Sequence, residues 1–294
     1  MSLTSARRAA TARCSRPARA TFFEVIPLPV IIPIDDPDDP RIAGYRDIRE
    51  KDLVGRQGLF VAEGEVVLRM LLAQRRHQPL SMLIADKRIE RLGPMLAAAP
   101  QAVPVYAASQ AVMDHVVGFP IHRGVLGLAR RAEAPDSGAL LASLPPRALA
   151  LCLFGIANHD NMGGLFRNAA AFGVGAVLLD AQCCDPLYRK AIRVSVGGAL
   201  VTPFARLGAD DDPIGLLRAF GFEPLALTPK GRTPLKDLRP PQRAALLLGA
   251  EGPGLDERLI DQATDVCIPM SAGFDSLNVA TAGAIALHQL ALAE

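Results

Sequence analysis

The feature that most constrains the fold is a regular alternation of short apolar runs and helix-like segments that begins at residue 148. Residues 148–154 are continuously apolar, which is typical of a strand in a sheet that is covered on both faces. Strands separated by helices favour a parallel, helix-covered sheet and therefore the α/β fold class. The pattern predicts further strands at 176–179, 199–204, 224–227, 244–248 and 265–268, and helices at 163–172, 186–194, 213–220, 256–263 and 277–290.

A smaller set of alternating elements comes earlier in the chain and predicts a compact α/β domain over residues 41–132. Residues 133–146 are rich in proline and small residues and are predicted to link this domain to a second one over 147–294. Within 41–132, strands are predicted at 60–62, 79–85, 103–106 and 124–129, and helices at 64–73, 88–99 and from Ser109 to about Gly118.

Residues 1–40 have a different composition. The first 20 residues hold five arginines and no acidic residue. We expect a basic segment that is disordered or extended, and an arm that contacts nucleic acid is the alternative. The apolar run at 21–34 is interrupted by a glutamate and three prolines, and it is shorter than the ~20 residues that a membrane-spanning helix needs. We therefore expect no membrane partner.

Net charge and cysteine usage exclude little. The formal charge of +2 does not by itself identify a partner. The five cysteines include no Cys-x-x-Cys pair with zinc spacing, so we expect reduced structural thiols in a cytoplasmic protein and no metal site. The sequence also lacks the glycine fingerprint of dinucleotide-binding folds after its apolar run at 148–154, a Walker phosphate loop and a Gly-x-Ser-x-Gly elbow.

The segment 265–290 predicts a strand, a loop and a helix, a junction where α/β folds bind ligands. Ser276 is predicted to cap the helix, and Ser276 and Asn278 are predicted to face a small molecule. Small residues dominate this last helix, which favours close packing.

Two further polar clusters follow predicted strands. In residues 158–173, Asn161 begins a helix and Arg167 lies about two turns inside it. An arginine on an apolar helix favours an anionic partner such as phosphate, although a surface arginine is the alternative. In residues 248–255, three glycines surround Glu251 and allow a ligand to approach the backbone closely. Taken alone, this second cluster is more often an ordinary tight turn.

In order and spacing, these three clusters resemble the three motifs of SpoU/TrmH-type RNA 2′-O-ribose methyltransferases of the SPOUT superfamily. The motif residues are Asn161, Gly163, Arg167 and Gly173 in the first, Gly249 to Leu255 in the second, and Ile268 to Met270 with Ser276 to Ala280 in the third. Residues 55–64 and 124–127 more weakly resemble a ribosomal-protein-like RNA-recognition domain.

The resemblance implies a trefoil-knotted parallel sheet, an exception to the rule that chains do not thread loops. It also implies S-adenosyl-L-methionine as cofactor, RNA as substrate and a homodimer formed through the C-terminal domain. By position, the cofactor would contact Leu227, Thr228, Gly249, Glu251, Gly254, Ile268, Met270 and Leu277.

The resemblance also implies the catalytic residues. Guanidinium almost never loses a proton, so Arg167 is expected to anchor the target phosphate while that phosphate or Glu251 takes the proton. Asn161, Ser276 and Asn278 would hold the sugar and the loops. The sequence departs from the family pattern at Asn168, where a small hydroxyl residue is common, and at Ala280, where Ser often occurs.

Two alternatives remain open at this point. The chain could be a knotted methyltransferase that acts on a base, or an RNA-binding protein whose methyltransferase domain is vestigial. Whether the substrate is tRNA or rRNA does not follow from the sequence.

Overall fold

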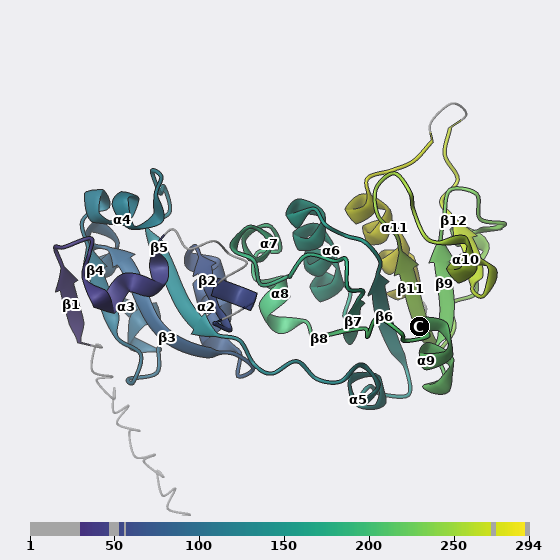
Figure 1. The fold of residues 1–294 in the computed structure, drawn as a ribbon, viewed down its shortest axis with the longest axis horizontal. Helices are drawn as coiled ribbons and strands as arrows, with labels where there is room; N and C mark the ends of the chain where they lie inside the picture. The colour runs from purple at the N-terminus through teal and green to yellow at the C-terminus, as the bar shows by residue number, and fades with distance from the viewer. Residues whose placement is uncertain (1–29, 47–52, 56, 272–274, 292–294) are drawn as a thin grey trace, which may run out of the picture.

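The computed structural model describes residues 30–46, 53–55, 57–271 and 275–291. The arginine-rich start of the chain therefore lies outside the described residues. Two α/β units lie side by side, the N-terminal unit at the left of Figure 1 and the C-terminal unit at the right. None of the helices in the described part of the chain is long and apolar enough to cross a membrane.

The C-terminal unit is built on a seven-stranded sheet in which every pairing is parallel, as the sequence predicts. Its order is β10-β12-β9-β11-β6-β7-β8. The strands are β6 (Ala148–Leu153), β7 (Ala176–Leu179), β8 (Phe204–Arg206), β9 (Glu223–Leu227), β10 (Thr233–Pro234), β11 (Arg243–Leu248) and β12 (Thr264–Cys267). Strand β11 lies between β6 and β9, which both precede it in the chain. The predicted trefoil knot stays a prediction.

Helices cover both faces of this sheet, because successive residues of a strand point to opposite sides. Leu151 and Leu153 of β6 lie in one apolar cluster with α6 (His159–Ala171), α7 (Arg189–Val194), α8 (Gly198–Val201) and α11 (Val279–Ala291). Ala150 and Cys152 of the same strand lie in a second cluster with α5 (Ser137–Ala142), α9 (Pro213–Ala219) and α10 (Glu257–Asp261).

The segment predicted as a strand at 199–204 is wrong in its first half, where the chain forms the short helix α8. Gly197 precedes it at a φ of 85°, and the backbone at Gly198 lies so close to α6 that a Cβ there would meet the Phe166 carbonyl oxygen at 2.7 Å. A short buried apolar run has no periodicity that separates helix from strand. Helix α7 begins at Arg189 rather than at the predicted Pro186.

The N-terminal unit is a mixed five-stranded sheet in the order β1-β4-β3-β5-β2. Its strands are β1 (Ile31–Ile34), β2 (Leu59–Glu63), β3 (Gln78–Ala85), β4 (Val105–Ala108) and β5 (Val125–Arg130), with helices α2 (Glu65–Ala73), α3 (Asp86–Ala97) and α4 (Gln110–Val117) and the 3-10 turn η1 (Pro40–Tyr45). Strand β1 pairs in parallel with β4. The predicted domain start at residue 41 therefore leaves out a strand of this sheet.

The segment predicted as a linker at 133–146 contains helix α5. Asp136 caps this helix by accepting a hydrogen bond from the Ala139 amide at 3.0 Å, and Leu140 and Leu141 are buried against the C-terminal sheet. The N-cap aspartate and the two buried leucines favour a helix more strongly than the flanking prolines oppose it.

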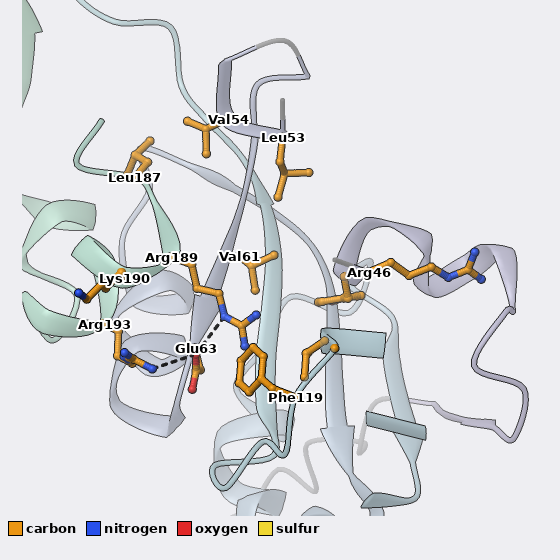
Figure 2. A pocket seen from close by; sticks show the side chains of 13 residues that line it. Arg46, Leu53, Val54, Val61, Glu63, Phe119, Leu187, Arg189, Lys190 and Arg193 are labelled. Carbon is orange, nitrogen blue, oxygen red and sulfur yellow. Dashed lines mark hydrogen bonds and ion pairs between the residues drawn. The ribbon is translucent and has the colours of Figure 1, made fainter. Parts of the chain in front are cut away.

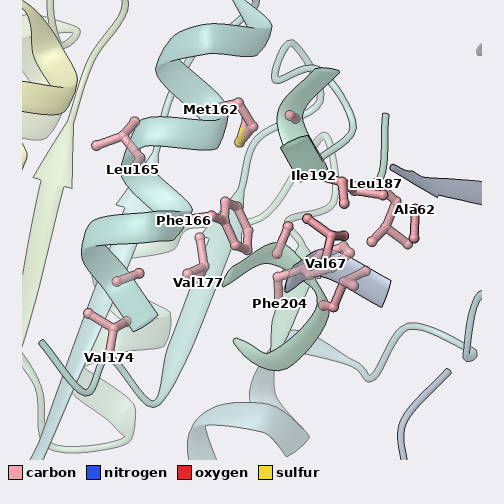
Figure 3. Packing of buried hydrophobic residues seen from close by; sticks show 14 of the residues in the cluster. Ala62, Val67, Met162, Leu165, Phe166, Val174, Val177, Leu187, Ile192 and Phe204 are labelled. Carbon is pink, nitrogen blue, oxygen red and sulfur yellow. The ribbon is translucent and has the colours of Figure 1, made fainter. Parts of the chain in front are cut away.

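The two units share one apolar core. Figure 3 shows Ala62 and Val67 of the N-terminal unit packed beside Leu187, Ile192 and Phe204 of the C-terminal unit. Part-buried polar contacts cross the same boundary: Arg189 Nε donates to Glu63 Oε2 at 2.9 Å, and Arg131 Nη1 donates to Asp185 Oδ2 at 2.8 Å. Because these groups are paired, their burial is tolerated and the units hold a defined orientation.

Candidate active site

The order of the strands brings three of the predicted cofactor segments to one edge of the C-terminal sheet. Neighbouring strands β11, β9 and β12 end at Leu248, Leu227 and Cys267, so Gly249, Thr228 and Ile268 follow side by side. The Thr228 amide donates to the Val266 carbonyl at 3.0 Å, which ties the end of β9 to β12. The carboxyl edge of a parallel sheet is where α/β proteins bind ligands.

The turn after β11 is very tightly closed. A Cβ at Gly249 would overlap the backbone of Gly254 and Leu255, and the Gly254 amide donates to the Ala250 carbonyl at 3.0 Å. Gly252 and Gly254 have φ values of 90° and 75°, which side chains other than glycine rarely adopt. The glycines are therefore required by the backbone path, and Glu251 is held exposed within the turn.

Asn278 connects the three motifs. Its Nδ2 donates to Asn161 Oδ1 and to Glu251 Oε1, each at 2.9 Å. Asn161 is only 7% exposed at the start of α6, whereas Glu251 and Asn278 are exposed. Residues that are 117 and 27 positions from Asn278 thus form one hydrogen-bonded cluster, and Glu251 Oε2 keeps no partner among the described residues.

The prediction that Ser276 caps the last helix is wrong. Helix α11 begins at Val279, and Asn278 Oδ1 accepts from the amides of Ala280 at 2.9 Å and Thr281 at 3.3 Å. Asparagine caps helices as well as serine does, so the sequence offers both residues. Ser276 is exposed and makes no hydrogen bond within the part of the chain that the structure describes.

Replacing Asn278 should therefore destabilise the fold more than replacing Ser276. Asn278→Ala removes a helix cap and the partner of the buried Asn161 Oδ1, and we expect the free energy of unfolding to fall by about 1–2 kcal/mol. Ser276→Ala should change it by less than about 0.5 kcal/mol. Urea unfolding of both variants measures the difference. Asn278→Asp, which keeps the cap but loses the Nδ2 donors, separates the two contributions; equal effects of Asn278→Ala and Ser276→Ala would contradict the assignment.

The predicted apolar residues of the cofactor site are half-buried. Leu227 and Ile268 pack against the apolar core that the two units share. Met270 and Leu277 are also half-buried and lie on either side of 272–274, which are outside the described residues. The carboxyl edge of the C-terminal sheet thus combines apolar side chains with the backbone of the turn at Gly249.

Asp265 is a site-supporting residue that the sequence reasoning missed. It accepts hydrogen bonds from Arg232 Nε at 3.0 Å and from the Arg232 amide at 2.9 Å, which holds the loop after Thr228 against β12. The hydrogen bond from the Arg232 side chain, followed by that from its amide, lowers the pKa of Asp265 to about 2. A carboxylate inside an otherwise apolar strand was the available signal.

The structure does not bring Arg167 into the Asn278 cluster. Arg167 is exposed on α6 and makes no hydrogen bond or ion pair with any described residue. It follows Asn161 by six positions, which places the two side chains about 120° apart around a helix with 3.6 residues per turn. Its guanidinium is therefore available to an external anion.

The two positions where the sequence departs from the family pattern contact each other. Asn168 Nδ2 donates to the Ala280 carbonyl at 2.8 Å. A Cβ on Gly164, one turn earlier on α6, would meet the Ala280 Cβ at 2.9 Å. Small residues thus allow α6 and α11 to pack closely behind the site.

Helix α7 lies beside the start of α6 and was not predicted to contribute to the site. Lys190 Nζ pairs with Asp160 Oδ2 at 2.6 Å, and the rings of His159 and Tyr188 are 5.1 Å apart. Among the described residues, no three His, Cys, Asp or Glu side chains gather as they would around a metal ion.

Comparison with known families identifies relatives of this chain. The sequence model of the SpoU rRNA Methylase family matches residues 148–288. An uncharacterized tRNA/rRNA methyltransferase of Mycobacterium bovis is 42% identical over 268 residues, which cover 86% of this chain and 89% of the relative. A 23S rRNA (guanosine-2′-O-)-methyltransferase of Coxiella burnetii is 33% identical over 177 residues, covering 58% of this chain and 69% of the relative.

Solved structures share the fold. An S-adenosylmethionine-bound rRNA methyltransferase from Sinorhizobium meliloti superposes with a TM-score of 0.73 at 22% identity, over 88% of this chain and 97% of that one. The SpoU methyltransferase AviRb from Streptomyces viridochromogenes, in complex with the same cofactor, has a TM-score of 0.72 at 19% identity, over 86% and 98%.

Proposed function

The chain belongs to the SpoU rRNA Methylase family of RNA methyltransferases, and from this premise we propose that it methylates a ribose 2′-hydroxyl of tRNA or rRNA with S-adenosylmethionine. The observation that carries the proposal is the Asn278 side chain, which bridges Asn161 and Glu251 across three motifs. The guanosine-2′-O specificity of the Coxiella burnetii relative supports the ribose as the methylated group.

The residues at the sheet edge fit the cofactor. Half-buried Leu227, Ile268, Met270 and Leu277 suit an adenine ring, while the exposed backbone of the turn from Gly249 to Gly254 and the polar Thr228 suit its polar edges. When bound, the cofactor supplies an electrophilic methyl group on a sulfonium. The position of β11 between β6 and β9 is compatible with a knotted site, which we include in the proposal.

The chain's own residues would position the RNA and accept a proton. Asn278 occupies Glu251 Oε1, which orients the carboxylate and leaves Oε2 to accept the proton of the attacking hydroxyl, with the RNA phosphate as the other candidate acceptor. Arg167 has no anionic partner among the described residues, so its fork of donors can hold that phosphate. Exposed Ser276 would donate to the sugar.

We also propose that the protein acts as a homodimer in the cytoplasm, where its RNA substrates lie. Helix α11 is rich in alanine, and its Ile285 is 42% exposed. An exposed apolar residue on a helix of small side chains suits close packing across a two-fold axis.

The proposal predicts two measurable activities of the purified chain. Calorimetry should show saturable binding of S-adenosylmethionine, and incubation with total RNA should transfer its labelled methyl group to ribose. Mapping of ribose methylation in RNA from cells with and without the protein identifies the nucleotide. Methyl groups found only on bases would replace the ribose assignment. Cofactor binding without transfer to any RNA, or no cofactor binding at all, would favour the vestigial alternative.

A further inference from the structure

A groove of about 390 Å³ lies where the two units meet, outside the candidate active site. Strand β2, the chain after α4 and helix α7 contribute its walls. Figure 2 shows Phe119 and Glu63 of the N-terminal unit facing Arg189 and Arg193 of the C-terminal unit. The groove therefore exists only because the two units are packed together.

One wall of the groove is basic. Arg189, Lys190 and Arg193 all come from α7, and they share two carboxylates, Glu63 and Asp160. The Arg193–Glu63 pair is long, at 3.9 Å, and the Arg193 side chain is 41% exposed. These cations therefore retain donors for a further anion.

Arg189 carries the clearest unmet hydrogen-bonding demand. Its Nε is used by Glu63, but its Nη2 is buried and has no hydrogen-bond partner among the described atoms. A buried guanidinium nitrogen without a partner costs free energy, and a small shift of the Arg189 side chain toward a phosphate oxygen in the groove would supply one.

The other wall carries an exposed aromatic ring. Phe119 is 44% exposed, and its ring centroid lies 5.0 Å from Arg189 Cζ. Gly118, at a φ of 79°, ends α4 and directs the chain so that Phe119 follows at the groove. A ring beside a cation, open to solvent, is the combination on which nucleic-acid bases stack.

The groove leads toward the candidate active site. Lys190 pairs with Asp160, and Asp160 directly precedes Asn161 at the start of α6. Figure 1 shows α7 between the N-terminal sheet and α6. A strand lying in the groove would therefore continue along α7 toward Asn161.

We infer that this groove holds a single-stranded segment of the RNA substrate, with one base stacked on Phe119 and adjacent phosphates on Arg189, Lys190 and Arg193. The inference rests on the proposed function, because it supplies the RNA contact of the same enzyme. The cations of α7 complement phosphates, and the exposed ring of Phe119 can stack on a base. A nucleic-acid strand offers both groups, whereas a protein segment offers no phosphates, so we favour the nucleic-acid strand.

Fluorescence anisotropy with a labelled single-stranded RNA of mixed sequence, and with the same strand in a duplex, tests the inference on the full chain. Phe119→Ala should weaken single-strand binding by roughly tenfold, because each stacked base contributes substantially. Its effect on the duplex should be small, since bases there are already stacked. Lys190→Gln and Arg193→Gln should each lower the slope of log affinity against log salt by about 0.7. Arg189 is left intact, because its removal would strand the buried Glu63.

Arg147→Ala is the matched control, because it also removes one exposed cation. Arg147 directly precedes β6 and so lies at the amino ends of the strands, opposite the edge that holds the candidate site. Wild-type affinity in both Phe119→Ala and Lys190→Gln, or equal losses for single strand and duplex in Phe119→Ala, would overturn the inference. Calorimetry with S-adenosylmethionine tests the proposed function separately. Groove-dependent RNA binding without cofactor binding would leave the groove standing and remove the methyltransferase proposal.

Discussion

Arg167→Ala should lower the rate of methyl transfer by about 10²-fold, the loss typical when a group that holds the substrate in its reactive position is removed. Affinity for S-adenosylmethionine should be unchanged, because Arg167 is not part of the strand-end cluster that is proposed to hold the cofactor. Stability should also be unchanged, since the side chain is exposed and makes no polar contact with the described residues. Initial rates on saturating RNA, paired with calorimetry, measure both quantities.

Two control variants sharpen this prediction. Arg167→Lys keeps the charge but loses the planar fork, so an intermediate rate would identify two-point contact with phosphate. Arg147→Ala removes an exposed arginine before β6 and should leave the rate at the wild-type value. Near-wild-type turnover of Arg167→Ala would remove this residue from the mechanism and leave Glu251 as the proton acceptor without an anchored phosphate beside it.

Gly249→Ala should abolish most cofactor binding. A Cβ at this position would overlap the backbone of Gly254 and Leu255, and backbone cannot yield as the end of a flexible side chain can. The turn must open to relieve an overlap that costs about 1–3 kcal/mol, and each 1.4 kcal/mol is tenfold in affinity. We expect cofactor affinity to fall by about 10–100-fold in calorimetry, with RNA binding at the groove retained.

Alanine substitutions at two other glycines separate the effect of atomic overlap at Gly249 from the general effect of replacing a glycine. Gly93 lies in α3, and a Cβ added there would have no atom within 4 Å. Gly93→Ala should leave the stability of the fold unchanged or raise it slightly, because alanine favours the helix. Gly252→Ala meets no neighbouring atom either, but its φ is 90°, so it reports the conformational cost alone. Cofactor affinity of Gly249→Ala equal to that of Gly93→Ala would contradict the proposed location of the site.

The convergence of the three motifs could be predicted because it depends on local patterns. Apolar runs identify β6 and β11, and a run that contains Asp265 identifies β12. The loops that follow such strands lie at one edge of a parallel sheet. That edge holds Asn161, Glu251 and Asn278 in one hydrogen-bonded cluster. The glycines of residues 248–255 likewise predict a turn whose backbone conformation and close approach other side chains would prevent.

Other features of the structure could not be predicted from local patterns, because more than one residue could cap the helix and more than one conformation suited the same apolar run. Ser276 and Asn278 are both good caps, and only the position at which α11 packs on α6 selects Asn278. Residues 198–201 are apolar enough for strand or helix, and the close approach of Gly198 to α6 decides for helix. Asp265 gains its role only because the loop carrying Arg232 folds back on β12.

The sequence by itself therefore determined the α/β class, the family and the edge of the C-terminal sheet where the candidate site lies, because strand periodicity and motif spacing are short-range properties. Only the tertiary structure decided the groove between the units. Its central ion pair joins Glu63 and Arg189 across 126 positions, and Phe119 reaches Arg189 from another element. Such contacts depend on how two independently patterned sheets pack through a shared apolar core, and no periodicity in either sheet specifies that packing.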